Sequence, residues 1–155
     1  MNSFEHFREV KTIIIQEYFR QFLLKNELAN YSCIYYPSIS KTPNIIGCVD
    51  CGNEWITYQT DERGKAYSIL EFNNIFLAFN NMLERYGVEF DLTSFNDIDP
   101  ITLLGMAKEH LEFKIEQYKE NEENRRWFEH KLRIINNYLE FYNNNDTKKS
   151  PKQIN

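Results

Sequence analysis

The amino-terminal part of the chain has the apolar spacing of an α-helix. Across residues 4–29, large apolar side chains recur three and four positions apart, so they share one face of a helix. These side chains are Phe7, Val10, Ile14, Tyr18 and Phe22. The pattern predicts one amphipathic helix with this face turned inward.

Between residues 30 and 70 the helical spacing gives way to short runs rich in Ile, Tyr, Val and Cys, separated by Pro and Gly. Such runs, bounded by turn residues, are typical of β-strands. We expect four antiparallel strands, at residues 31–36, 45–49, 54–59 and 65–69. The last two are joined by a turn in which Gly64 can take the positive φ that hairpin loops require.

Helical spacing returns after the strands and predicts three more helices. The first begins near Phe72 and ends before Gly87, a residue type common just after a helix. The second begins at Asp99-Pro100, with Asp as N-cap and Pro at the first helical position. The third covers residues 122–142. We therefore expect an α+β fold, with a small antiparallel sheet of about four strands packed against about four helices.

Length and composition indicate one domain. A chain of 155 residues with 42% hydrophobic residues can bury a single core, so we expect residues 1–142 to form one α+β domain. Residues 143–155 are polar and are expected to form a disordered tail. An aromatic content of 15% leaves large side chains for a recognition surface as well as for the core.

Charge and hydropathy limit the classes of partner. A net charge of −5 opposes binding to the phosphate backbone, so we expect no nucleic-acid partner. The first residues have neither a basic segment nor an apolar run of the kind found in export signals. No run approaches the roughly 20 apolar residues that span a bilayer. We expect a cytoplasmic protein without a membrane partner.

The sequence contains none of the motifs GxSxG and HExxH, and no phosphate-binding glycine loop. We therefore expect no catalytic residues, no bound metal and no cofactor. Cys48 and Cys51 have the spacing of half a zinc site, and Cys33 with one His could complete it. We interpret these residues mainly as reduced thiols packed like small apolar side chains. A small zinc-binding or redox protein that uses Cys33, Cys48 and Cys51 is the alternative.

Two segments are less generic. The hairpin motif, residues 55–64, is an aromatic strand that runs into a charged tip. The double-Arg motif, residues 125–132, places two Arg before two aromatic residues at the start of the last helix.

In this order, the two motifs resemble the immunity protein 63 family of bacterial polymorphic toxin systems, over residues 47–141. That family is characterised by a Glu-Arg-Gly turn after an aromatic strand and by a double Arg that leads an amphipathic helix. The matching residues are Glu62-Arg63-Gly64 and Arg125-Arg126-Trp127-Phe128. The resemblance implies an immunity protein that binds the toxin C-terminal domain and neutralises it in a stoichiometric complex. Such a toxin belongs to a contact-dependent or other polymorphic system.

If the toxin is a nuclease, its basic cleft would attract an acidic inhibitor. Acidic and aromatic residues in turns and at expected exposed strand positions are therefore the partner-binding candidates. They are Glu54, Tyr58, Asp61, Glu62, Glu89, Asp91, Asp97 and Asp99.

The residues that carry the resemblance are interpreted as structural. They are Trp55, Arg63, Gly64, Arg125, Arg126, Trp127 and Phe128. A guanidinium pairs well with a carboxylate, so one of the three Arg could clamp the hairpin to a helix. Direct contact between these Arg residues and the toxin is the alternative.

Overall fold

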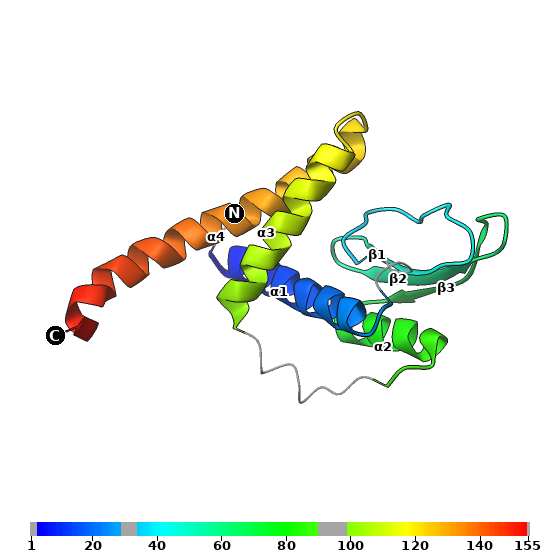
Figure 1. Cartoon of the computed structure of the whole chain (residues 1–155), viewed down its shortest axis with the longest axis horizontal. Helices are drawn as coiled ribbons and strands as arrows, with labels where there is room; N and C mark the ends of the chain where they lie inside the picture. Colours follow the sequence, from blue (N-terminus) through cyan, green and yellow to red (C-terminus); the bar gives the residue numbers. More distant parts are fainter. Residues whose placement is uncertain (1–2, 29–33, 90–98, 155) are drawn as a thin grey trace. The chain divides into compact units, whose positions relative to one another are not determined.

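The computed structural model describes residues 3–28, 34–89 and 99–154, and it describes side chains over 8–28, 34–89 and 99–144. Within these ranges, four helices and three strands follow in the order α1, β1, β2, β3, α2, α3 and α4 (Figure 1). The expected α+β class is confirmed. No helix in the described part of the chain is both long enough and apolar enough to span a membrane.

The contacts divide the chain into two compact units. The helical unit contains residues 1–17 and 98–155, and the sheet unit contains residues 18–97. Helix α1 (Ser3–Lys25) contributes its first part to the helical unit and its last two turns to the sheet unit.

The sheet unit is built on a three-stranded antiparallel meander. The strands β1 (Ile46–Asp50), β2 (Trp55–Thr60) and β3 (Ala66–Phe72) pair in the order β1-β2-β3. Thr57 lies opposite Cys48 on one side and Leu70 on the other. The β2–β3 ladder is irregular between Thr57 and Gln59, where Ser68 takes a φ of +53°.

The strand expected at residues 31–36 is wrong, because the sheet has three strands among the described residues. Residues 31–33 lie outside them, and Ile34 and Tyr35 form a turn. Both side chains are buried, so their apolar character reflects packing and not strand pairing. One backbone hydrogen bond runs from Asp50 N to Tyr36 O at 2.9 Å. Pro37 follows at once and has no N–H with which to continue a ladder.

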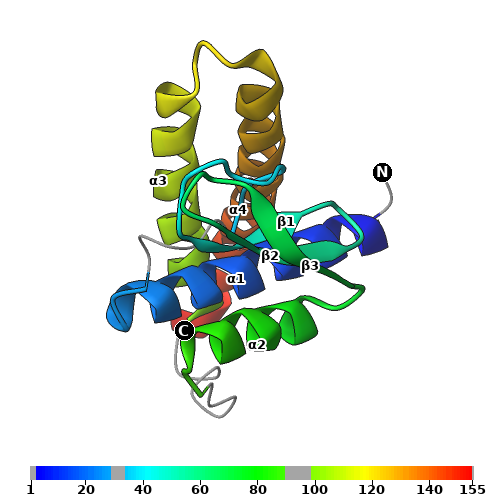
Figure 2. The same cartoon turned by 90° about the vertical axis from the view of Figure 1, so that its right-hand side faces the viewer.

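Helix α2 (Ile75–Tyr86) packs along the sheet (Figure 2). The side chain of Asn74 accepts hydrogen bonds from two backbone N–H groups of the first turn, as an N-cap does. Gly87 ends the helix with a φ of +75°, which confirms the expected terminus. The start lies later than expected because Phe72 pairs with Trp55 in the sheet.

Two apolar clusters stabilise the sheet unit. In the first, Phe19 of α1 stacks on Phe79 of α2, with ring centroids 3.7 Å apart and planes 5° apart. The second contains Ile45, Val49 and Tyr58. Thr57 hydrogen-bonds to Asn81 on α2, and the next residue, Tyr58, points to the other face of the sheet because side chains alternate along a strand.

The helical unit contains a helix pair, α3 (Pro100–Gln117) and α4 (Glu122–Ile154). Asp99 is the N-cap residue of α3 and Pro100 begins the helix, as expected, although the Asp99 side chain accepts from Thr102 Oγ1 at 3.1 Å and from no backbone N–H. The two helices bury a shared set of apolar side chains: Leu103, Leu104, Ala107, Leu111, Phe128, Ile134 and Ile135. Helix α4 continues to Ile154 through the segment expected to be a disordered tail.

Candidate functional site

The tip of the β2–β3 hairpin is organised by Asp61. Its Oδ1 accepts hydrogen bonds from Arg63 N and Lys65 N, both at 2.9 Å. Its backbone oxygen accepts from Gly64 N at 3.0 Å and from Asn44 N at 3.1 Å. Asp61 therefore holds its own turn and joins it to the preceding loop.

These hydrogen bonds lower the pKa of Asp61 below its ordinary value of 3.8, with the bond from Lys65 N–H as the largest cause and that from Arg63 N–H next. An N–H donor stabilises the charged carboxylate more than the neutral acid. The acidic tip residue chosen for partner contact thus has a structural role, and Glu62 beside it is exposed.

Gly64 leaves no room for a side chain in the hairpin turn. It has a φ of +82°, and a Cβ built on it would lie 2.0 Å from the carbonyl oxygen of Lys41. A side chain at this position would both strain the backbone and collide with the loop. This supports the structural interpretation of Gly64, while Arg63 next to it is exposed.

Tyr58 differs from its expected exposed position. It is 0% exposed, and its hydroxyl accepts a hydrogen bond from Ser40 N at 3.0 Å. The hydroxyl lies so close to Gly47 that a Cβ there would be 2.5 Å away. Tyr58 is therefore a core residue and not a surface contact, because the loop before β1 covers this face of β2. Trp55, in the same strand, is 8% exposed.

The remaining acidic candidates are distributed over both units. Those that are exposed are Glu54, Glu62, Glu89 and Asp99. Asp91 and Asp97 lie outside the described residues.

One group of carboxylates gathers at a corner of the sheet. The pKa of the Cys51 thiol is raised, first by desolvation and then by the charges of Asp50, Glu54 and Glu71. The sheet register places these carboxylates at one end of the strands, since Asp50 lies opposite Trp55, Glu54 precedes Trp55, and Glu71 lies opposite Ile56. We call Asp50, Glu54 and Glu71 the acidic corner. Glu54 and Glu71 are exposed there, whereas Asp50 is buried.

Strand β3 has an exposed apolar surface that the sequence pattern did not predict. Tyr67 is 48% exposed, Ile69 is 50% exposed and Leu70 is 45% exposed. We call these three residues the β3 surface. A signal for it was present, since the last strand of a meander lies at an edge, but strands with apolar side chains on both faces are usually buried.

Arg85 of α2 joins β3 to the helix by hydrogen bonds. Its Nη2 donates to Ser68 O at 2.7 Å and to Thr57 Oγ1 at 3.1 Å. Its Nε donates to Asn81 Oδ1 at 3.0 Å. Desolvation lowers the pKa of Arg85, and the nearby Tyr67 raises it in part. The guanidinium thus fixes the irregular backbone at Ser68 to the helix.

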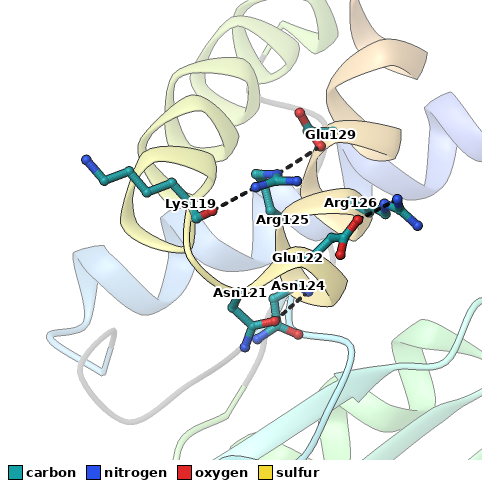
Figure 3. A network of polar contacts seen from close by, with 7 residues as sticks. All are labelled: Lys119, Asn121, Glu122, Asn124, Arg125, Arg126 and Glu129. Carbon is teal, nitrogen blue, oxygen red and sulfur yellow. Dashed lines mark hydrogen bonds and ion pairs between the residues drawn. The ribbon is translucent and has the colours of Figure 1, made fainter.

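The double-Arg motif closes the turn between α3 and α4 (Figure 3). Arg125 Nη1 donates to Lys119 O at 2.7 Å, and its Nε lies 3.6 Å from Glu129 Oε1. Arg126 pairs with Glu122 on the same helix. These partners lie on α4 and in the turn before it, so each of these contacts is local to the helix pair.

The two aromatic residues of this motif differ in exposure. Phe128 is 0% exposed and lies 5.6 Å from Tyr118, measured between ring centroids. Trp127 is half-buried, with Lys131 Nζ 5.2 Å from its ring centroid. A hollow of about 440 Å³ adjoins the first turns of α4. It is lined by Glu122, Glu123, Arg126, Trp127 and His130.

The cysteines of the alternative hypothesis are not gathered into a visible site. Cys48 is buried and Cys51 is exposed, while Cys33 lies outside the described residues. Within the part of the chain that the structure describes, no group of three or more His, Cys, Asp or Glu residues could hold a metal ion.

No family model matches this chain, and neither the curated proteins nor the solved structures contain a match. The resemblance to the immunity protein 63 family rests on the two sequence motifs.

Proposed function

We propose that this chain is an immunity protein, which neutralises a cognate bacterial toxin domain by binding it in a stoichiometric complex. The observation that carries the proposal is the β3 surface. Ile69 and Leu70 are neighbours in β3, so their side chains point to opposite faces of the sheet edge. Large apolar side chains that are about half exposed along an edge strand commonly mark a site of protein–protein contact. The two motif resemblances suggest what kind of protein is bound.

The charge around this surface supports a basic partner. Glu71 lies within β3 itself, and Glu54 is exposed directly before Trp55, which pairs with Phe72 of β3. The whole chain carries a net charge of −5. A toxin that cleaves nucleic acid has a basic cleft, and an acidic inhibitor associates quickly with such a cleft.

The roles of the motif residues support the same proposal. Gly64 and Asp61 build the hairpin turn, and Arg125 closes the turn between α3 and α4. These residues hold a scaffold, which leaves the exposed β3 side chains for recognition. An inhibitor of this kind needs no catalytic group.

Co-expression tests the proposal. The toxin to use is the C-terminal domain of a secreted protein encoded directly upstream of this chain. We expect the chain to restore growth of cells that express this domain, and the two proteins to elute together at a one-to-one ratio. A domain that still arrests growth in the presence of the chain would refute the proposal.

The double substitution Ile69→Lys with Leu70→Lys should abolish rescue. Both side chains are about half exposed, so the exchange to Lys removes apolar contact area and should leave the fold intact. Phe113→Lys is the matched control, because Phe113 is 63% exposed and lies on α3. Equal rescue by the double variant and the control would show that β3 is not the binding surface.

A further inference from the structure

Strand β3 lies at the edge of the sheet. Among the residues that the structure describes, it pairs with β2 and with no other strand. An edge strand presents unpaired backbone N–H and C=O groups along its outer side, and a strand from another chain can pair with them.

β3 has few of the features that normally prevent such pairing. Natural edge strands are protected by Lys, by Pro, by bulges or by covering segments. Residues 66–72 contain neither Lys nor Pro, and the one charged side chain is Glu71. Residues 67–71 are exposed, so the described chain does not cover this part of the strand.

The one irregularity divides β3 into two parts. Ser68 has a φ of +53°, and its carbonyl oxygen accepts from Arg85 Nη2. From Leu70 to Phe72 the ladder is regular, and these residues lie opposite Thr57, Ile56 and Trp55 in turn. The segment 69–72 therefore has the extended backbone that a new strand requires.

The negative charge beside residues 69–72 favours a partner strand with basic side chains. Glu71 belongs to the segment, and the exposed Glu54 directly precedes Trp55, which pairs with Phe72. If two copies of this chain paired through residues 69–72, both Glu71 carboxylates would lie in one short ladder, and each chain has a net charge of −5. Like charges in close cross-strand positions destabilise pairing. A basic strand is the better complement.

We propose that residues 69–72 of β3 accept an extended, basic segment of the partner as an additional strand of the sheet. Main-chain hydrogen bonds would supply affinity, the side chains of Ile69 and Leu70 would contact apolar residues of that segment, and Glu71 would pair with its Lys or Arg. This inference deepens the proposed immunity function and rests on it for the identity of the partner.

A synthetic peptide that alternates Val and Lys tests strand pairing without the toxin. The probe is added to the isotope-labelled full chain, and amide chemical shifts are followed by NMR. We expect shifts centred on residues 69–72, and slower hydrogen exchange of amides in this segment.

Two altered peptides separate main-chain pairing from other contacts. Methylation of alternate backbone nitrogens removes donors without removing side chains, and it should weaken binding about tenfold or more. Replacement of Lys by Glu should weaken binding as well. Equal binding of the methylated peptide, or shifts confined to other elements, would overturn the inference.

Two protein variants complete the test. Glu71→Lys should weaken binding of the Val-Lys peptide and strengthen binding of the Val-Glu peptide, while Phe113→Lys should bind as the parent does. A contrary outcome is that the parent chain dimerises as its concentration rises, while the double variant Ile69→Lys with Leu70→Lys stays monomeric. That result would show that β3 pairs with a second copy of this chain, and it would overturn the inference.

The outcome is distinguishable from that of the proposed function. Peptide binding at β3 together with failed rescue would refute the immunity function and retain the strand-accepting edge. Rescue without any peptide binding would retain the immunity function and refute the added strand.

Discussion

Gly64 lies so close to Lys41 that a Cβ added to the glycine would be 2.0 Å from the lysine carbonyl oxygen. The contact joins the hairpin tip to the loop before β1. It explains why a glycine stands in the Glu-Arg-Gly turn, and it makes this position sensitive to substitution.

Gly64→Ala should lower the free energy of unfolding by about 3 kcal/mol, because it adds a steric clash to the cost of a positive φ. Gly52→Ala is the matched control, since Gly52 has a φ of +92° and a Cβ added to it would have nothing within 4 Å. That substitution should cost about 1 kcal/mol. Urea unfolding of both variants measures the difference. Equal losses in the free energy of unfolding would mean that the loop at Lys41 moves away from the added methyl group without further destabilisation.

The Asp61 carboxylate should make stability depend on pH. Its pKa is lowered in the folded chain, so its contribution is present above the ordinary value of 3.8 and is lost as the pH falls through the lower folded value. The stability difference between the parent and Asp61→Ala should therefore shrink below about pH 4. Urea unfolding across this range measures it.

Asp61→Asn is the control for this prediction. The amide oxygen of Asn can still accept from Arg63 N and Lys65 N, but the side chain does not titrate. The stability difference between Asp61→Asn and Asp61→Ala should therefore not change over the same pH range. A change as large as that of the parent would show that another group is responsible.

The two arginines of the double-Arg motif should differ in their contribution to stability. Arg125→Ala removes the hydrogen bond to Lys119 O and should cost about 1 kcal/mol. Arg126→Ala breaks an ion pair with Glu122 in which both side chains are more than 60% exposed, and it should cost about 0.5 kcal/mol or less. Thermal unfolding of both variants checks the order. A larger loss for Arg126→Ala would contradict the local roles that we assign.

Arg85→Lys should loosen β3 although it keeps the charge. A lysine cannot reproduce the planar set of donors that reaches Asn81, Thr57 and Ser68 O, so we expect a loss of about 1–2 kcal/mol. Hydrogen exchange should become faster at β3 amides near Ser68. Unchanged exchange there would mean that β2 alone holds the irregular backbone.

Two helix ends could be predicted because local residues determine them. Gly87 takes the left-handed conformation just after α2, and Pro100 begins α3 after Asp99. In each case, neighbours in the chain supply most of the interactions, so a short window of sequence contains the information. The hairpin between β2 and β3 was predictable for the same reason, since Gly64 and Asp61 act within the turn.

The sites were harder to predict because exposure depends on distant segments. Alternation along β2 suggested an outward Tyr58, but both faces of β2 are covered, one by α2 and one by the loop that contains Ser40. Residues 34–36 looked like a strand because they are apolar, yet Ile34 and Tyr35 are buried in a turn. A period of two shows which side chains share a face, and it does not show what lies on that face.

The sequence alone determined the α+β class, the helix ends at Gly87 and Pro100, and the turn at Gly64, because short-range sterics and hydrogen bonds decide each of them. Only the tertiary structure decided that Tyr58 is buried and that Ile69 and Leu70 are exposed. These side chains have similar apolar character, so their positions depend on which segments pack over each strand. That packing is settled by contacts between residues far apart in the chain.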